Sequence, residues 1–213
     1  TRFLQEAQVT GQLSHPNIPP IYDLGLGPGG AGWFSMRALP GRSLSQVLRE
    51  GPLGIARALE IFGKVCDAVG YAHDRDVLHL DLKPGNLIVG DFGEVYVIDW
   101  GLARKVSKGP PTATFDAQTA EVRGTPAYMS PEQAADTALD VRTDVYALGS
   151  LLYAMVTGKA PFGTGEEALR RRASGEIPAP RRLRPDLPWE LSAVIRRAMA
   201  VRPEARYATV AEL

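Results

Sequence analysis

The sequence has only one cysteine and no long hydrophobic run, and these two features bear on whether the chain is secreted and whether it crosses a membrane. Cys66 by itself cannot form an internal disulfide, and no charged stretch followed by an apolar one opens the chain, so nothing indicates secretion. The longest largely apolar stretch, residues 145–156, is too short to cross roughly 30 Å of hydrocarbon. We therefore expect a cytoplasmic chain with no membrane segment of its own; an anchor elsewhere in a longer protein stays open.

Net charge is also absent, because Lys and Arg number 24 and Asp and Glu number 24. This balance argues against nucleic acid as a partner of the whole chain. The 213 residues are 45% hydrophobic and 23% charged, which favours one globular domain with a sizeable core over a disordered chain. The first residue is threonine, so we expect a processed or cut N-terminus, or a piece of something longer.

Hydrophobic periodicity predicts the main elements and places Cys66 on the apolar face of a helix, as a buried and unreactive thiol. Residues 102–127 lack any periodicity and are too long for an ordinary connection, so we expect a functional or mobile segment there. The predicted elements are a helix over 3–14, strands over 18–24 and 33–39, a helix over 55–72, a hairpin over 87–98, and helices over 144–157 and 191–200.

Residues 25–30 read G-x-G-x-x-G, which is a pattern of nucleotide-phosphate loops. Such a loop needs a helix after its last glycine so that backbone amides face the phosphates, but a strand-like segment, residues 33–36, follows here. A glycine-rich hairpin turn is the better interpretation.

The segment over residues 77–86 and the later Asp99-Trp100-Gly101 carry the chemistry. At Asp81, Asn86 and Asp99 they resemble the catalytic loop of protein kinases, H-R-D-x-x-x-x-N, and the metal-binding D-F-G. We call residues 79–86 the catalytic loop. Phosphoryl transfer requires positioning and charge neutralisation: hard oxygens for Mg²⁺, a carboxylate for the hydroxyl proton, and a cation near the phosphate. Asn86 and Asp99 fit the first role, Asp81 the second and Lys83 the third.

A literal D-F-G also begins at Asp91, and the predicted hairpin distinguishes the two. A turn centred on residues 91–94 would place Asn86 opposite Asp99 at one end, with Asp91 roughly 16 Å away at the other. Two oxygen ligands of one Mg²⁺ each lie near 2.1 Å from it, so Asp99 and not Asp91 can share a metal with Asn86. Asp91 is then a turn residue.

The resemblance extends over essentially the whole chain and is closest to bacterial serine/threonine protein kinases of the eukaryotic-like type. It implies an α+β, two-lobed fold: residues 1–39 as a partial N-lobe with the hinge, and residues 40–213 as a mostly helical C-lobe with a clipped C-terminus. For ATP, it implies Glu6 as the partner of an anchoring lysine and Met36 as the gatekeeper. It further implies that backbone groups of Arg37 and Leu39 bind adenine, with Ile88 beneath the ring.

Other residues are assigned by the same resemblance. Residues 124–132 resemble a peptide-binding segment, in which Thr125 would bridge Asp81 and Lys83, an arrangement associated with Ser/Thr acceptors. The remaining assignments are structural: Asp144 supports the catalytic loop, His79 holds it in place, and Glu132 pairs with Arg206.

Three departures from the family pattern stand out. Leu80 replaces an arginine that grips phosphate in many kinases, which argues against regulation through that contact. Trp100 replaces Phe as another large apolar side chain. Nothing precedes Glu6 that matches the family's glycine-rich loop or anchoring lysine, since the first lysine is Lys64.

These features predict an ATP- and Mg²⁺-dependent kinase domain that transfers the γ-phosphoryl group to Ser or Thr hydroxyls of a protein substrate. The missing phosphate contacts predict that these 213 residues alone are impaired. A pseudokinase-like module that binds partners without catalysis is the alternative. A small-molecule kinase is disfavoured by residues 124–132.

Overall fold

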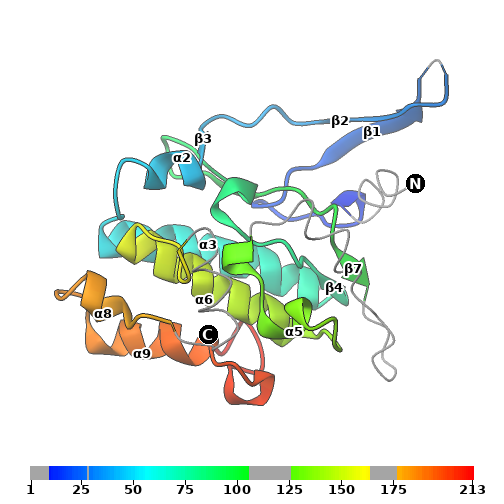
Figure 1. Ribbon diagram of the computed structural model, residues 1–213. Helices are drawn as coiled ribbons and strands as arrows, with labels where there is room; N and C mark the ends of the chain where they lie inside the picture. Colours follow the sequence, from blue (N-terminus) through cyan, green and yellow to red (C-terminus); the bar gives the residue numbers. More distant parts are fainter. Residues whose placement is uncertain (1–9, 28, 106–125, 164–176) are drawn as a thin grey trace.

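Two long helices, α3 (Ile55–His73) and α6 (Val141–Thr157), pack against each other at the centre of the molecule (Figure 1). The structure is a computed structural model that describes residues 10–27, 29–105, 126–163 and 177–213. α6 begins where the Asp140 side chain accepts the N–H of Arg142 and ends at Gly158, whose φ of 70° reverses the chain. Every residue from Thr143 to Thr157 is buried, as the all-round apolar pattern predicted.

The described elements follow in chain order, with two-residue strands among them. They are β1 (Ile21–Leu26), β2 (Gly32–Met36), β3 (Arg42–Ser43), α2 (Leu44–Leu48), α3, β4 (Val77–Leu78), η1 (Pro84–Asn86), β5 (Leu87–Val89), β6 (Val95–Val97), β7 (Arg104–Lys105), η2 (Pro126–Tyr128), α5 (Pro131–Ala134), α6, α8 (Pro180–Leu183), α9 (Trp189–Ala198) and η3 (Pro203–Ala205). The mixture of small sheets and a larger helical part agrees with the predicted α+β class.

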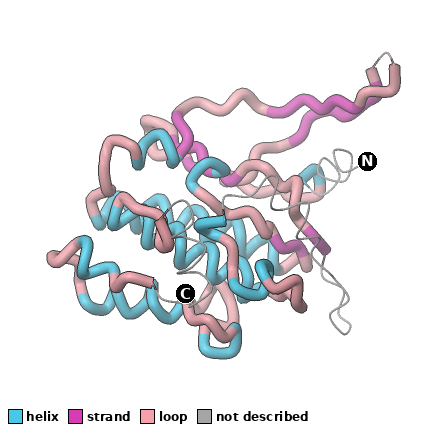
Figure 2. Tube along the Cα trace, in the orientation of Figure 1, coloured by secondary structure: helices cyan, strands magenta, loops and turns pink. Residues whose placement is uncertain are grey.

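β1 and β2 form an antiparallel hairpin that extends away from the helical part (Figure 2). Gly27 donates its N–H to the carbonyl of Ala31 at 2.7 Å, which closes the glycine-rich turn. The interpretation of this glycine-rich segment as part of a hairpin is therefore confirmed, although Gly25 and Leu26 still belong to β1. β1 begins only at Ile21 because two prolines, which have no N–H to donate, precede it.

The β5–β6 hairpin has a different loop from the predicted one. Gly90 donates its N–H to the carbonyl of Glu94 at 2.8 Å, so the loop has three residues, and Gly93 takes a φ of 90° that glycine adopts without strain. Asp91 lies in this loop, as expected of a turn residue.

This shorter loop moves the strand register by one residue. Leu87 pairs with Val97, and the N–H of Ile98 donates to the carbonyl of Asn86 at 2.9 Å. The prediction that Asn86 stands opposite Asp99 was therefore wrong by one position. Asp99 follows Ile98 directly, so Asn86 and Asp99 still lie at the same end of the hairpin.

β4 and β7 form a separate two-stranded sheet, in which Val77 lies opposite Lys105 and Leu78 opposite Arg104. Residues 104–105 belong to the segment 102–127 that shows no periodicity in the sequence, because two residues are too few to produce a periodic pattern. Residues 106–125 lie outside the described residues, as do residues 1–9, which hold most of the first predicted helix.

The other predicted helices are confirmed with small shifts of their ends: α3 matches the prediction over 55–72 and α9 that over 191–200. Cys66 on α3 is half-buried, and its burial raises the pKa of its thiol to about 12, so it stays protonated at neutral pH. Across the described part of the chain, no helix combines the length and the apolarity that a membrane span needs.

Candidate active site

Two polar side chains of the catalytic loop, those of Lys83 and Asn86, converge on the carboxylate of Asp81. Lys83 Nζ donates to Asp81 Oδ2 at 2.6 Å, and Asn86 Nδ2 donates to the same oxygen at 3.0 Å and to the Asp81 carbonyl at 2.9 Å. The turn of η1 positions them, because the N–H of Asn86 donates to the carbonyl of Lys83. The structure thus brings together three of the four residues predicted to be catalytic. The fourth, Thr125, lies outside the described residues.

Asp144, in the first turn of α6, holds the backbone of the catalytic loop through hydrogen bonds. Its fully buried carboxylate accepts the backbone N–H of His79 at 2.8 Å, the N–H of Leu80 at 2.9 Å, and His73 Nε2 at 2.8 Å. Burial by itself would raise the pKa of Asp144, but the hydrogen bond and charge of His73, together with His79, bring it below its usual range. The predicted supporting contact of Asp144 with the loop is confirmed.

Leu80 has a left-handed backbone conformation, with φ of 65°, which is costly for a branched apolar residue. Both of its backbone polar groups are satisfied across the fold: Asp144 accepts its N–H, and Gln133 Nε2 donates to its carbonyl at 2.8 Å. Its side chain is buried in an apolar cluster with Leu78 and Leu139. Such a cluster offers no charge to a phosphate, in agreement with the expectation from the sequence.

His79 links the catalytic loop to the segment that carries Asp99. Its Nδ1 accepts the N–H of Asp81 at 3.2 Å, so the proton is on Nε2, which faces the carbonyl of Ile98 at 3.3 Å. Burial lowers the pKa of His79 despite the surrounding carboxylates, so the ring is neutral at pH 7. Trp100 lies 4.5 Å from this ring between centroids and is 2% exposed, which confirms its role as an apolar packing residue.

Asp99 is exposed and has a left-handed backbone with φ of 62°. One carboxylate oxygen accepts the N–H of Gly101 at 3.4 Å. Because Asn86 uses its Nδ2 atom on Asp81, its Oδ1 atom remains for another ligand. Among the described residues no three His, Cys, Asp or Glu side chains group together as metal ligands. Two hard oxygen donors suit Mg²⁺, which keeps several water or phosphate ligands, and the residues present fit that ion.

The residues predicted to contact ATP lie on two separate segments of the chain, namely the end of β2 with the residues after it, and β5. Met36 ends β2 and is 38% exposed, Arg37 is exposed, and Leu39 is half-buried. Ile88, also half-buried, lies on β5 opposite Ser43 of β3. Glu6 lies outside the described residues.

Gly41 allows the close approach that joins these elements to β5. It has a φ of 110°, and an added Cβ would lie 2.3 Å from the carbonyl oxygen of Val89. No larger residue fits there without moving the strand that carries Ile88.

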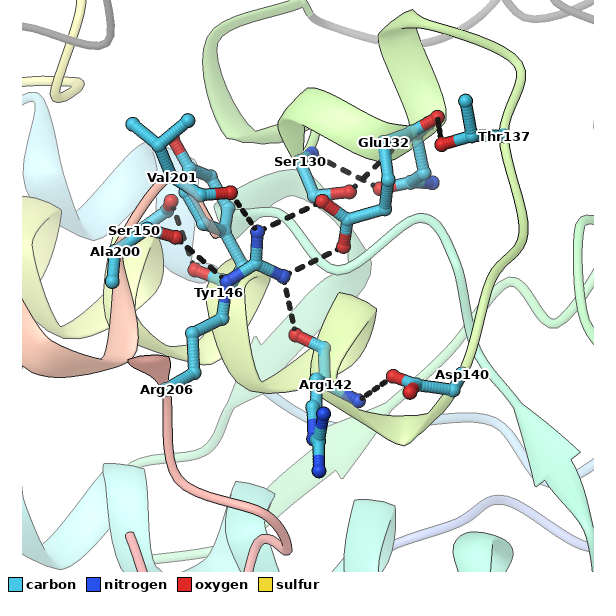
Figure 3. A network of polar contacts seen from close by, with 11 residues as sticks. Ser130, Glu132, Thr137, Asp140, Arg142, Tyr146, Ser150, Ala200, Val201 and Arg206 are labelled. Atoms are coloured by element: carbon cyan, nitrogen blue, oxygen red, sulfur yellow. Dashed lines mark hydrogen bonds and ion pairs between the residues drawn. The ribbon is translucent and has the colours of Figure 1, made fainter. Parts of the chain in front are cut away.

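Arg206 and Glu132 form a buried ion pair, as predicted, and Figure 3 shows the network around it. Arg206 Nη1 and Nη2 donate to the two Glu132 oxygens at 2.6 and 2.8 Å. The remaining guanidinium donors reach backbone carbonyls of Ala200, Arg142 and Val201 at 2.8 to 3.0 Å. Burial would raise the pKa of Glu132, but the hydrogen bond and charge of Arg206 lower it. The pair joins the start of α5 to the segment after α9.

Two supporting residues were not found from the sequence. His73 binds Asp144 across 71 positions, and no local pattern indicates that contact. Gln133 contacts Leu80 across 53 positions; its only local sign is the S-x-x-Q capping box with Ser130 at the start of α5.

A family model described as protein kinase domain matches residues 1–212, so the chain belongs to the protein kinase domain family. Its relatives include the serine/threonine-protein kinase PknB of Mycobacterium tuberculosis, 37% identical over 218 residues, an alignment that covers 100% of this chain and 34% of that protein. PknD of Protochlamydia amoebophila is 34% identical, and a probable serine/threonine-protein kinase of Corynebacterium efficiens is 38% identical; the alignments cover the whole chain and 24% and 33% of those proteins. The resemblance to bacterial kinases is confirmed. The chain spans about a third of the length of the PknB relatives it matches.

Proposed function

We propose that this chain is the catalytic domain of an ATP- and Mg²⁺-dependent kinase that phosphorylates Ser and Thr hydroxyls of a protein. The observation that carries this proposal is the convergence of Lys83 and Asn86 on the carboxylate of Asp81. Membership of the protein kinase domain family and the names of the bacterial relatives support it. The protein substrate and ATP are the partners that it requires.

Each of the predicted catalytic and metal-binding residues has a distinct role in this proposal. Asp81 orients the acceptor hydroxyl and takes its proton, while Lys83 places a positive charge beside the phosphoryl group in transit. Asn86 and Asp99 would hold Mg²⁺, which offsets the negative charge of the phosphates when bound. Thr125 would bridge Asp81 and Lys83 when a substrate hydroxyl is present.

We assign the nucleotide site to the end of β2, the residues that follow it, and β5. Met36 would border the adenine pocket, backbone groups of Arg37 and Leu39 would bind its edge, and Ile88 would pack beneath the ring. Glu6 would pair with a lysine that anchors the phosphates. We propose that residues 1–39 belong to an N-lobe and contain the hinge that contacts the nucleotide.

A matched pair of substitutions tests the proposal, because the chain offers two Asp residues in similar sequence contexts. In the full-length protein, transfer from labelled ATP to a mixture of proteins should yield phosphoserine and phosphothreonine. Asp99→Asn should reduce the rate at least about 100-fold at fixed Mg²⁺, since a metal ligand is lost. Asp91→Asn, on the exposed hairpin loop, should stay within about twofold.

Equal losses in both variants, or no loss with Asp99→Asn, would contradict the assignment of the metal ligand. A folded full-length protein that transfers no phosphate would contradict the kinase proposal itself. That result would favour a binding module without catalysis.

A further inference from the structure

A pocket with a volume of about 420 Å³ lies beside the catalytic loop. One wall comes from α2 and the residue after it, a second from Lys83 and the two residues that follow, and a third from η2 and the end of α6. Lys83 therefore belongs both to this pocket and to the cluster around Asp81, to which its Nζ donates at 2.6 Å. Whatever fills the pocket lies within a side chain's length of the proposed reaction centre.

The charge of this pocket has one sign. Arg49, Lys83 and Lys159 line it, and no acidic side chain does. Arg49 and Lys159 are exposed, and neither forms an ion pair within the described part of the chain. By contrast, Arg42, a short distance earlier in the chain, pairs with Glu50. Lys83 is paired with Asp81, so the positive charge that the described residues leave unneutralised in this pocket is that of Arg49 and Lys159.

The rest of the lining is mostly small or apolar. Leu48, Pro84 and Ala160 are among these residues. Apolar walls of low polarisability increase the field that the cations produce inside the pocket. A carboxylate with a short aliphatic stem matches both features, whereas a lysine or arginine side chain would meet like charge.

We infer that this pocket binds an acidic side chain of the protein substrate, on the same peptide segment as the acceptor hydroxyl. The inference rests on the proposed kinase function and adds a substrate class to it. Because Lys83 borders both sites, the acidic residue should lie within about two to four positions of the acceptor, at about 3.3 Å per extended residue. Arg49 and Lys159 are then specificity-determining residues.

Matched peptides test this inference with the full-length protein. Each peptide carries one serine in a neutral background and a Glu, Gln or Lys at one of the four positions on either side. At the best position, we expect kcat/KM for Glu to exceed that for Gln by about fivefold to tenfold and Lys to fall below Gln. The difference should reside mainly in KM and shrink in 0.5 M salt, where the screening length is only several ångströms.

Charge reversal assigns the effect to the pocket. The double variant Arg49→Glu/Lys159→Glu should prefer the Lys peptide over the Glu peptide, and the single variants Arg49→Gln and Lys159→Gln should each lose part of the preference for Glu. Arg196→Glu reverses one positive charge at an exposed position of α9 outside the pocket lining and should keep the wild-type preference.

The outcomes separate this inference from the function on which it rests. Equal kcat/KM for the Glu, Gln and Lys peptides at every position would overturn the inference and leave the kinase proposal standing. A preference for Glu that survives in the double variant would also overturn the assignment to this pocket. Failure to phosphorylate any peptide or protein would overturn the proposed function, and the inference with it.

Discussion

Asp144 accepts the backbone N–H of Leu80 at 2.9 Å, across 64 positions of the sequence. Leu80 directly precedes Asp81, and its left-handed backbone, with φ of 65°, turns the chain at that point. Such a conformation costs about 1–2 kcal/mol for a residue other than glycine, whereas a hydrogen bond to a charged group contributes about 1.5–3 kcal/mol. The buried carboxylate therefore holds Asp81 in place at the expense of local strain.

Removing the Asp144 carboxylate should destabilise the catalytic loop and lower the free energy of unfolding. Asp144→Ala leaves three donors without their partner, namely the N–H groups of His79 and Leu80 and the ring of His73. We expect the free energy of unfolding to fall by about 3–5 kcal/mol in urea titrations. Asp186→Ala, which removes an exposed carboxylate 3.5 Å from the Arg184 side chain, should cost less than about 1 kcal/mol. Similar losses in the two variants would refute the anchoring role.

The ion pair between Glu132 and Arg206 should also matter for stability. Glu132→Ala leaves the Arg206 guanidinium buried without a counter-charge, and we expect a loss of about 3–5 kcal/mol in the free energy of unfolding. The exposed pair of Arg202 and Glu204 is the control, and Glu204→Ala should lose less than about 1 kcal/mol. A Glu132→Ala variant as stable as the control would show that the buried pair contributes little.

The pH dependence of stability follows from the lowered pKa values of Asp144 and Glu132. Carboxyl groups of the unfolded chain titrate near pH 4, so below that value the unfolded state binds more protons than the folded state. The contribution of these two groups is complete above about pH 5 and is lost as the pH falls through the lower pKa values of the folded state.

Urea titrations between pH 7 and pH 3 measure this dependence. The wild type should lose stability more steeply below about pH 4 than Asp144→Asn, in which one of the two groups no longer titrates. The lowered pKa of His79 adds an earlier loss that begins as the pH falls below about 6.5, where the unfolded imidazole takes up a proton. Identical slopes for wild type and Asp144→Asn below pH 4 would contradict the assigned shift.

The long helices and the catalytic loop could be predicted from sequence because their signals are local. α6 carries an apolar pattern over several turns, and Asp81, Lys83 and Asn86 lie within one short loop. The pair of Glu132 and Arg206 came instead from the family resemblance, since nothing between these positions indicates that they meet.

The parts that sequence reasoning missed depend on single residues or on distant contacts. The register of β5 and β6 follows from a three-residue loop, which the positive φ of Gly93 permits. The same sequence is also compatible with a four-residue loop, so the sequence alone does not distinguish the two registers. The contacts of His73 with Asp144 and of Gln133 with Leu80 form only when elements far apart in the chain pack together. No periodicity of either segment contains that information.

The rate of single-turnover phosphoryl transfer in the full-length variant Asp81→Asn tests the central claim most directly. Asparagine keeps the shape of the side chain and its contact with Lys83 but cannot take the hydroxyl proton. We predict a rate about 10²- to 10⁴-fold below that of the wild type, with the free energy of unfolding lowered by no more than about 2 kcal/mol because the oxygen that accepts from Lys83 is kept. A folded Asp81→Asn protein that transfers phosphate within about threefold of the wild-type rate would contradict the claim that Asp81 is the centre of the reaction.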